Sequence, residues 1–196
     1  IPPLVPVLLH KFFPHNMKNY LLSAVLALFA APLFSQMMYT QARYQGDTLF
    51  PFDIPMMDID STQVLNSREV LALPKKGKKP TVIAFWLTTC MPCLRELSTY
   101  TANYAEWQKK ADFRLMAISI DFPHRFSHIA PIVREKQFPF EVYWDRDRLF
   151  RNVIPGELNG LPQVFIFDKN GNLAYRHKGF RPGDEVELFA KIVELQ

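Results

Sequence analysis

Two largely apolar runs, Thr81–Trp86 and Phe113–Ile120, predict strands that are buried on both faces of a sheet. Between them, over about 92–110, apolar and aromatic residues recur every three or four positions, which is typical of an amphipathic helix. A similar helical pattern covers about 126–137. The first three elements therefore predict a parallel strand–helix–strand crossover of right-handed sense.

The second half of the chain is predicted to contain a β-hairpin and a final helix. Asn170-Gly171 separates the strand-like runs 163–167 and 173–178, and this dipeptide is the strongest short-range hairpin signal. A short strand is expected at 142–144, a short helix at 146–153 and the last helix at 184–195. The order of elements indicates an α/β protein whose central mixed β-sheet is flanked by helices on both faces.

Composition favours one compact domain over residues 36–196. The chain has 196 residues, 48% hydrophobic and 21% charged, which is enough apolar material for a core and argues against intrinsic disorder. Residues 36–80 are rich in turn formers, and we expect one or two short strands there, at 48–54 and 64–73.

The charge balance argues against a nucleic-acid partner. Two of the 23 cationic residues, Lys11 and Lys18, lie within residues 1–35, which contain no Asp or Glu. The rest of the chain carries 21 cations against 19 anions, and this small excess does not predict a nucleic-acid-binding surface.

The segment 17–35 has the layout of a secretory signal peptide or membrane anchor. Met17 and Lys18 precede the apolar run 21–34, and the small residue Ser35 follows it. The run is shorter than the roughly 20 residues of a spanning helix, which favours cleavage near Ser35. We therefore expect an exported, periplasmic or otherwise extracytoplasmic protein, and residues 1–16 are interpreted as an upstream extension.

The only two cysteines are Cys90 and Cys93, in the sequence Cys-Met-Pro-Cys. They follow a predicted buried strand and open the long predicted helix. A helix N-terminus stabilises an anion, so the pKa of the Cys90 thiol should lie below its ordinary value of about 8.5. Cys93 is one turn further on the same face, where it can attack a mixed disulfide on Cys90. The pair predicts dithiol–disulfide exchange in which Cys90 attacks and Cys93 resolves.

The segment 85–96, Phe-Trp-Leu-Thr-Thr-Cys-Met-Pro-Cys-Leu-Arg-Glu, resembles the active-site segment of the thioredoxin-like proteins, and more narrowly the exported TlpA/ResA-type thiol-disulfide oxidoreductases. The resemblance continues through Gly160-Leu161-Pro162 and 165–171, and covers about 48–196. It implies a thioredoxin-like fold, protein thiol or disulfide substrates and a membrane-bound thiol electron donor. No cofactor is expected, because the cysteine pair itself carries the electrons.

The resemblance also implies roles for individual residues. Pro162 would be a cis-proline facing the cysteine pair, and the backbone of Leu161 would pair with a bound peptide. Glu96 would be a buried acid near the disulfide, and its spacing of three residues from Cys93 agrees with this. It would either raise the thiol pKa by repulsion or accept a proton from the resolving cysteine.

Two residues depart from the family pattern. Thr89 stands where a tryptophan is usual, and Gln163 stands where a threonine is common. Both would line the substrate groove, so they bear on the identity of the partner. Met91 and Pro92 offer no positive or donor group near the attacking sulfur, which favours a reductant or isomerase over a strong oxidant.

Two alternative functions are open from the sequence. The cysteine pair could act as soft ligands in a copper-handling or cofactor-delivery module. A thiol peroxidase is the other, but such sites place Pro and Thr before the reactive cysteine, whereas Ile83 and Leu87 stand seven and three residues before Cys90.

Overall fold

The computed structural model describes residues 54–60, 63–67, 79–154 and 156–196. The segment 17–35 and its expected export signal lie outside the described residues, as does most of the strand expected at 48–54. Within the described ranges, no helix combines the length and apolar character needed to cross a membrane.

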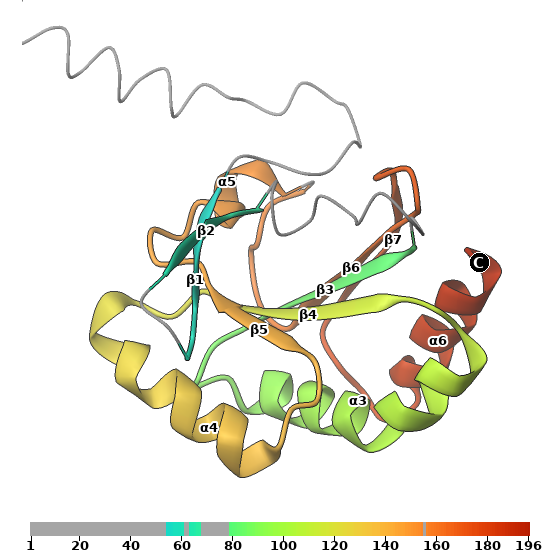
Figure 1. Cartoon of the computed structure of the whole chain (residues 1–196), viewed down its shortest axis with the longest axis horizontal. Coiled ribbons are helices and arrows are strands. Elements are labelled where there is room, and N and C mark those ends of the chain that lie inside the picture. Colours follow the sequence, from blue (N-terminus) through green and yellow to red (C-terminus); the bar gives the residue numbers. More distant parts are fainter. Residues whose placement is uncertain (1–53, 61–62, 68–78, 155) are drawn as a thin grey trace, which may run out of the picture. The chain divides into compact units, whose positions relative to one another are not determined.

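The described strands form one mixed sheet of seven strands in the order β2-β1-β5-β4-β3-β6-β7. The strands are β1 (Pro55–Asp58), β2 (Val64–Asn66), β3 (Thr81–Trp86), β4 (Arg114–Ser119), β5 (Glu141–Trp144), β6 (Gln163–Phe167) and β7 (Leu173–Lys178). β3, β4 and β5 run parallel, whereas β6 and β7 form the predicted antiparallel hairpin beside β3. The mixed sheet expected from the sequence is confirmed (Figure 1).

Helices cover both faces of this sheet. They are α3 (Met91–Lys110), the 3-10 turn η1 (Pro123–His128), α4 (Ile129–Lys136), α5 (Phe150–Val153) and α6 (Asp184–Glu194). The chain passes from β3 to β4 through α3 and from β4 to β5 through α4, and it moves in the same direction across the sheet each time. Because such crossovers are right-handed, α3 and α4 lie on one face of the sheet, and α6 lies on the same face (Figure 1). The short α5 packs on the opposite face.

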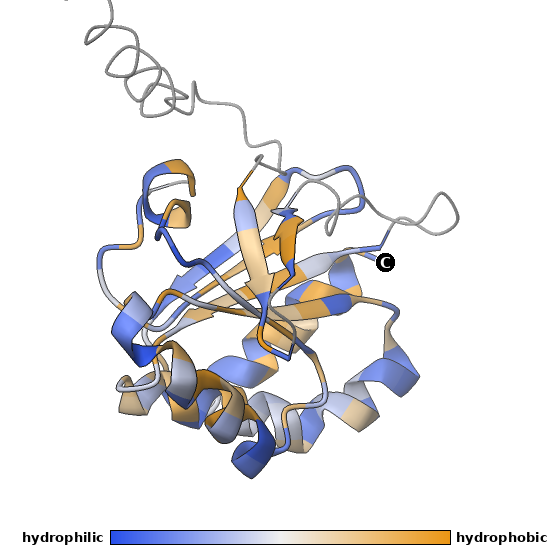
Figure 2. Cartoon of the chain, turned by 60° about the vertical axis from the view of Figure 1, so that its left-hand side comes forward, coloured by the Kyte–Doolittle hydropathy of each residue, from blue (hydrophilic) through white to orange (hydrophobic). Residues whose placement is uncertain are grey.

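The core consists of two layers separated by the sheet, and β3 shows how they are built. Its alternate residues Val82, Ala84 and Trp86 pack towards α3, α4 and α6. Ile83 and Phe85 point to the other side, against Phe150 of α5. All six residues of β3 are buried, as predicted for a central strand (Figure 2 shows the hydrophobic central strands). The strand end that carries the cysteine pair is therefore anchored in two layers of core.

Two helices are shorter than the sequence predicts. In the expected helix 126–137 the α-helix starts only at Ile129, because Pro131 lacks an amide hydrogen and is tolerated only in a first turn. In the expected helix 146–153, Arg148 adopts a left-handed conformation with φ 57°. The buried Asp145 carboxylate accepts the amide hydrogens of the next two residues, so the helix begins at Phe150.

Candidate active site

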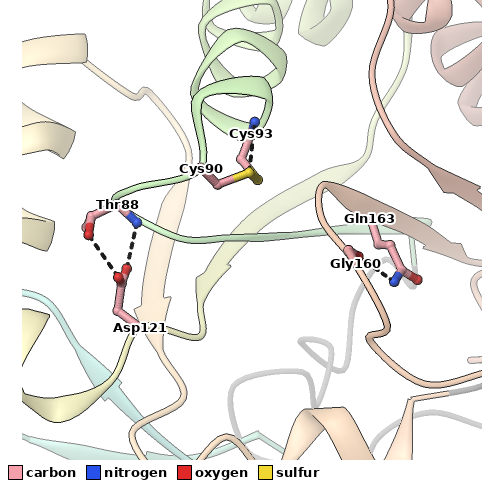
Figure 3. The surroundings of a disulfide bond; sticks show 6 residues. All are labelled: Thr88, Cys90, Cys93, Asp121, Gly160 and Gln163. Atoms are coloured by element: carbon pink, nitrogen blue, oxygen red, sulfur yellow. Dashed lines mark hydrogen bonds between the residues drawn. A yellow bond between two sulfur atoms is a disulfide. The ribbon is translucent and has the colours of Figure 1, made fainter.

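Cys90 and Cys93 form a disulfide at the junction between β3 and α3. Cys90 caps the N-terminus of α3, and its Sγ accepts a hydrogen bond from the Cys93 amide at 3.3 Å (Figure 3). The two Cα atoms are 5.2 Å apart. The side-chain sulfur thus occupies the place where a helix binds an anion.

The surroundings distinguish the two sulfurs. Cys93 is fully buried, whereas Cys90 is partly exposed, so an incoming protein can reach Cys90 first. The first turn of α3 contains no acidic residue that would offset the positive end of the helix, and Pro92 removes no needed hydrogen bond there. Both features fit a helix terminus that favours a thiolate on Cys90.

Glu96 is buried on α3, one turn beyond Cys93, with only 1% of its surface exposed. Tyr100 donates a hydrogen bond to its Oε1 at 3.0 Å, while Oε2 is buried without a hydrogen-bond partner. Burial raises the pKa of Glu96 from 4.5 to about 8; the hydrogen bond from Tyr100 lowers it and the nearby Asp184 raises it. At neutral pH the side chain is therefore mainly an uncharged acid.

The loop before β6 carries a cis peptide bond between Leu161 and Pro162. Pro92 of α3 lines the same cavity as these two residues, which has a volume of about 540 Å³. The loop is held to β7, because the amide of Gly179 donates to the Pro162 carbonyl at 2.8 Å. The cis-proline loop therefore faces the start of α3, beside the cysteine pair.

Of the two departures from the family pattern, only Thr89 is exposed to a partner. Gln163 is fully buried, so the expectation that it lines the substrate groove is wrong. Its amide donates to the Gly160 carbonyl at 2.7 Å (Figure 3), and its Oε1 accepts from the Arg176 guanidinium at 2.9 Å. Both the NH2 group and the oxygen of the Gln163 side chain are therefore bonded within the fold. The bond to Gly160 positions the cis-proline loop.

Asp121, which the motif analysis did not single out, holds the loop that leads to Cys90. Its carboxylate accepts hydrogen bonds from the backbone amide and the hydroxyl of Thr88, both at 2.8 Å (Figure 3), and from the Ser119 hydroxyl at 2.8 Å. It is almost completely buried. Its position in the sequence could have indicated this role. Asp121 follows β4, which runs parallel to β3, and the carboxyl ends of parallel neighbouring strands lie at the same edge of the sheet.

We expect Asp121→Ala to lower the free energy of unfolding by about 2–4 kcal/mol, because three donors lose a buried acceptor. Denaturant unfolding of the oxidised protein measures this. Asp112→Ala is the matched control, since that carboxylate is 73% exposed and its ion pair with Lys79 should contribute no more than about 1 kcal/mol. Equal effects of the two substitutions would contradict the anchoring role.

The described residues bear on the copper-handling alternative. They contain no group of three or more His, Cys, Asp or Glu side chains that could hold a metal ion. A copper-handling role would therefore depend on the two cysteine sulfurs after reduction, and it stays a prediction. Ile83 is buried in the sheet, so that position offers no polar group to a peroxide.

Comparison with known proteins shows which family the chain belongs to. Residues 53–176, well over half of the chain, match the AhpC/TSA family. The chain belongs to this family. An uncharacterized thioredoxin-like protein from Porphyromonas gingivalis has 31% sequence identity and a TM-score of 0.61, with 74% of this chain and 90% of that protein covered. No curated protein matches the chain significantly.

Two more distant structures share the fold of this AhpC/TSA family member. A protein assigned as the thiol:disulfide interchange protein DsbE from Chlorobium tepidum has a TM-score of 0.59 at 23% identity, covering 76% of this chain and 96% of its own. A secreted Mycobacterium tuberculosis disulfide oxidoreductase, homologous to E. coli DsbE, has a TM-score of 0.54 at 14% identity, covering 73% and 96%. The thioredoxin-like fold implied by the resemblance is thus confirmed.

Proposed function

We propose that this protein is a thiol-disulfide oxidoreductase that exchanges electrons with protein substrates through Cys90 and Cys93. The observation that carries the proposal is the placement of the pair: a partly exposed sulfur caps a helix N-terminus, and a buried sulfur lies one turn behind it. The cis-proline loop borders the same surface. No metal or organic cofactor takes part in this scheme.

The exchange proceeds in two displacements. The Cys90 thiolate attacks one sulfur of a substrate disulfide, so that a mixed disulfide forms and the second substrate sulfur leaves as a thiol. The Cys93 thiolate then attacks Cys90 Sγ, which releases the first substrate sulfur and forms the Cys90–Cys93 disulfide. Two electrons pass from the protein to the substrate, and the substrate gains two protons.

Glu96 supplies the proton acceptor for the second displacement. Cys93 is buried, so its thiol cannot lose a proton directly to bulk water. A neighbouring carboxyl whose pKa is raised to about 8 by burial is matched to thiol chemistry near neutral pH. The carboxyl accepts the proton in its ionised form, which is the minor form at pH 7, and because that form is minor, repulsion between charges is the weaker of the two roles.

Three further parts of the proposal come from the sequence. The residues between the two cysteines carry no charge, which supports a reductant or isomerase. A reductant in an oxidising compartment has to be reduced again, and a membrane-bound thiol protein would do this. The segment 17–35 would direct export to the periplasm or another extracytoplasmic space.

The reduction potential of the cysteine pair tests the direction. We expect a value on the order of −200 to −270 mV, in the range of reducing and glutaredoxin-type proteins. Equilibration with glutathione buffers, followed by thiol alkylation and mass spectrometry, measures it. A value near −120 mV, typical of a strong oxidant, would overturn the assignment as a reductant.

A further inference from the structure

A second cavity, distinct from the one beside the cis-proline, lies between the segment that follows β4 and the segment that precedes the cis-proline. Its volume is about 380 Å³, and its lining residues are Phe122, Arg148, Arg151, Asn152, Glu157, Leu158 and Asn159. We call it the arginine pocket. One wall, at Phe122, directly follows Asp121, which holds the loop before Cys90. The other wall, at Asn159, directly precedes Gly160 of the cis-proline loop.

The arginine pocket thus joins the two loops that flank the disulfide. Figure 3 shows Asp121 and Gly160 on either side of the cysteine pair in that view. Lys178 ties the second wall in place, because its ammonium donates to the Asn159 carbonyl at 2.7 Å. A protein segment bound across Cys90 would therefore pass close to this cavity.

The pocket contains a guanidinium that its neighbours hold in place but leave incompletely hydrogen-bonded. Arg148 stacks on the Phe122 ring, with its Cζ 4.0 Å from the ring centroid. Its Nε is buried and has no hydrogen-bond partner. The backbone at Arg148 is left-handed, and its amide donates to the Asp145 carbonyl at 3.2 Å, which closes the turn. A buried donor without a partner is destabilising, so it is packing against Phe122 that holds this part of the guanidinium in place.

The lining of the pocket carries one more positive than negative charge, because Arg148 and Arg151 stand against a single carboxylate, that of Glu157. Arg148 and Arg151 repel each other, and this repulsion, after burial, lowers the pKa of Arg148. Three carboxylates lie around them. Asp145 caps the amides that precede α5, Asp121 holds Thr88, and the exposed Glu157 makes no ion pair with either arginine. The first two are buried and already hydrogen-bonded; their charges raise the pKa of Arg148, but neither forms an ion pair with Arg148 or Arg151.

We propose that the arginine pocket binds the carboxylate of an Asp or Glu side chain that lies near the reactive cysteine of the protein substrate. A guanidinium matches a carboxylate with paired hydrogen bonds, and the amides of Asn152 and Asn159 add donors at the same cavity. The volume accommodates one such side chain with its backbone. This inference rests on the proposed exchange function and adds a preference for acidic substrate segments.

The test compares three peptides of equal length that contain one cysteine, activated as a disulfide with thionitrobenzoate. Two positions on each side of the cysteine are Glu, Gln or Lys. The Cys93→Ser protein is reacted with each peptide, and the release of thionitrobenzoate and the mass of the adduct give the rate of mixed-disulfide formation. We expect the Glu peptide to react about tenfold faster than the Gln peptide at low ionic strength, with the difference shrinking as salt is added.

Variants of the pocket decide whether the arginines cause this preference. Arg148→Gln and Arg151→Gln should each reduce the ratio of Glu to Gln rates to about two or below, and Glu157→Gln should increase it. Lys169→Gln is the matched control, because it removes one positive charge at the hairpin turn beyond the far end of β6 and should leave the ratio unchanged.

Each outcome bears on a different claim. Equal rates for the Glu and Gln peptides, or a preference that survives Arg151→Gln, would overturn the arginine pocket as a carboxylate site. Arg151 is exposed, so its substitution should leave the fold intact even if Arg148→Gln destabilises it. Failure to form a mixed disulfide with any of the three peptides would instead contradict the exchange function itself.

Discussion

Cys93→Ser is expected to abolish turnover and to accumulate a covalent complex with substrate. Cys90 is the partly exposed sulfur at the helix N-terminus, so it still attacks a substrate disulfide. The resolving thiol is then missing, and the mixed disulfide persists until an external thiol reaches it. Multiple-turnover reduction of a protein disulfide should fall to the uncatalysed level, while one equivalent of adduct forms. Non-reducing electrophoresis and intact mass measure the adduct.

Cys90→Ser is the matched control, since it removes the other sulfur of the same pair. Cys93 is fully buried, so this variant should lose turnover without forming an adduct. Comparable adducts from both variants would show that the two sulfurs are equally accessible and would contradict the proposed order of attack. A purely structural disulfide predicts a third result: both variants unfold more easily, and neither forms an adduct.

The sequence predicts those parts of the site that depend on short-range pattern. The boundaries of β6 and β7 match the predicted runs, because the Asn-Gly turn sets where the hairpin pairs. The strand–helix junction that carries Cys90 and Cys93 can be predicted in the same way, because the sequence changes there from a buried apolar run to helical spacing. Motif spacing also brings Glu96 to the right face of α3.

The rest of the site depends on contacts between residues that are distant in the chain. Thr88 and Asp121 are 33 residues apart and meet only because β3 and β4 are parallel neighbours. Gln163 looked like a groove residue from its position after Pro162, yet Arg176 on β7 binds its amide within the fold. The left-handed turn at Arg148 follows from its neighbours, and no local signal in an arginine predicts it.

Glu96→Gln should remove most of a pH-dependent loss of stability in the oxidised protein. The folded pKa of Glu96, about 8, lies above its ordinary value of 4.5, so the folded state binds more protons than the unfolded state between these values. Stability from this residue is therefore fully present below about pH 4.5 and is lost as the pH rises through about 8. Burial of the charged form costs up to about 5 kcal/mol over that range.

The difference between wild type and Glu96→Gln isolates this effect, because other groups titrate alike in both proteins. Denaturant unfolding near pH 5 should give similar stabilities, and by pH 9 the Gln variant should be more stable by about 3–5 kcal/mol. Glu106→Gln on the same helix is the control: Glu106 is 63% exposed, and its pair with Lys109 should produce a difference below about 1 kcal/mol at any pH. A wild-type stability that does not fall relative to Glu96→Gln would mean that the carboxyl ionises near its ordinary pKa. Glu96 would then be charged at pH 7 with a pKa far below that of a thiol, so it would be a weak acceptor for the Cys93 proton and its main effect would be repulsion of the thiolate.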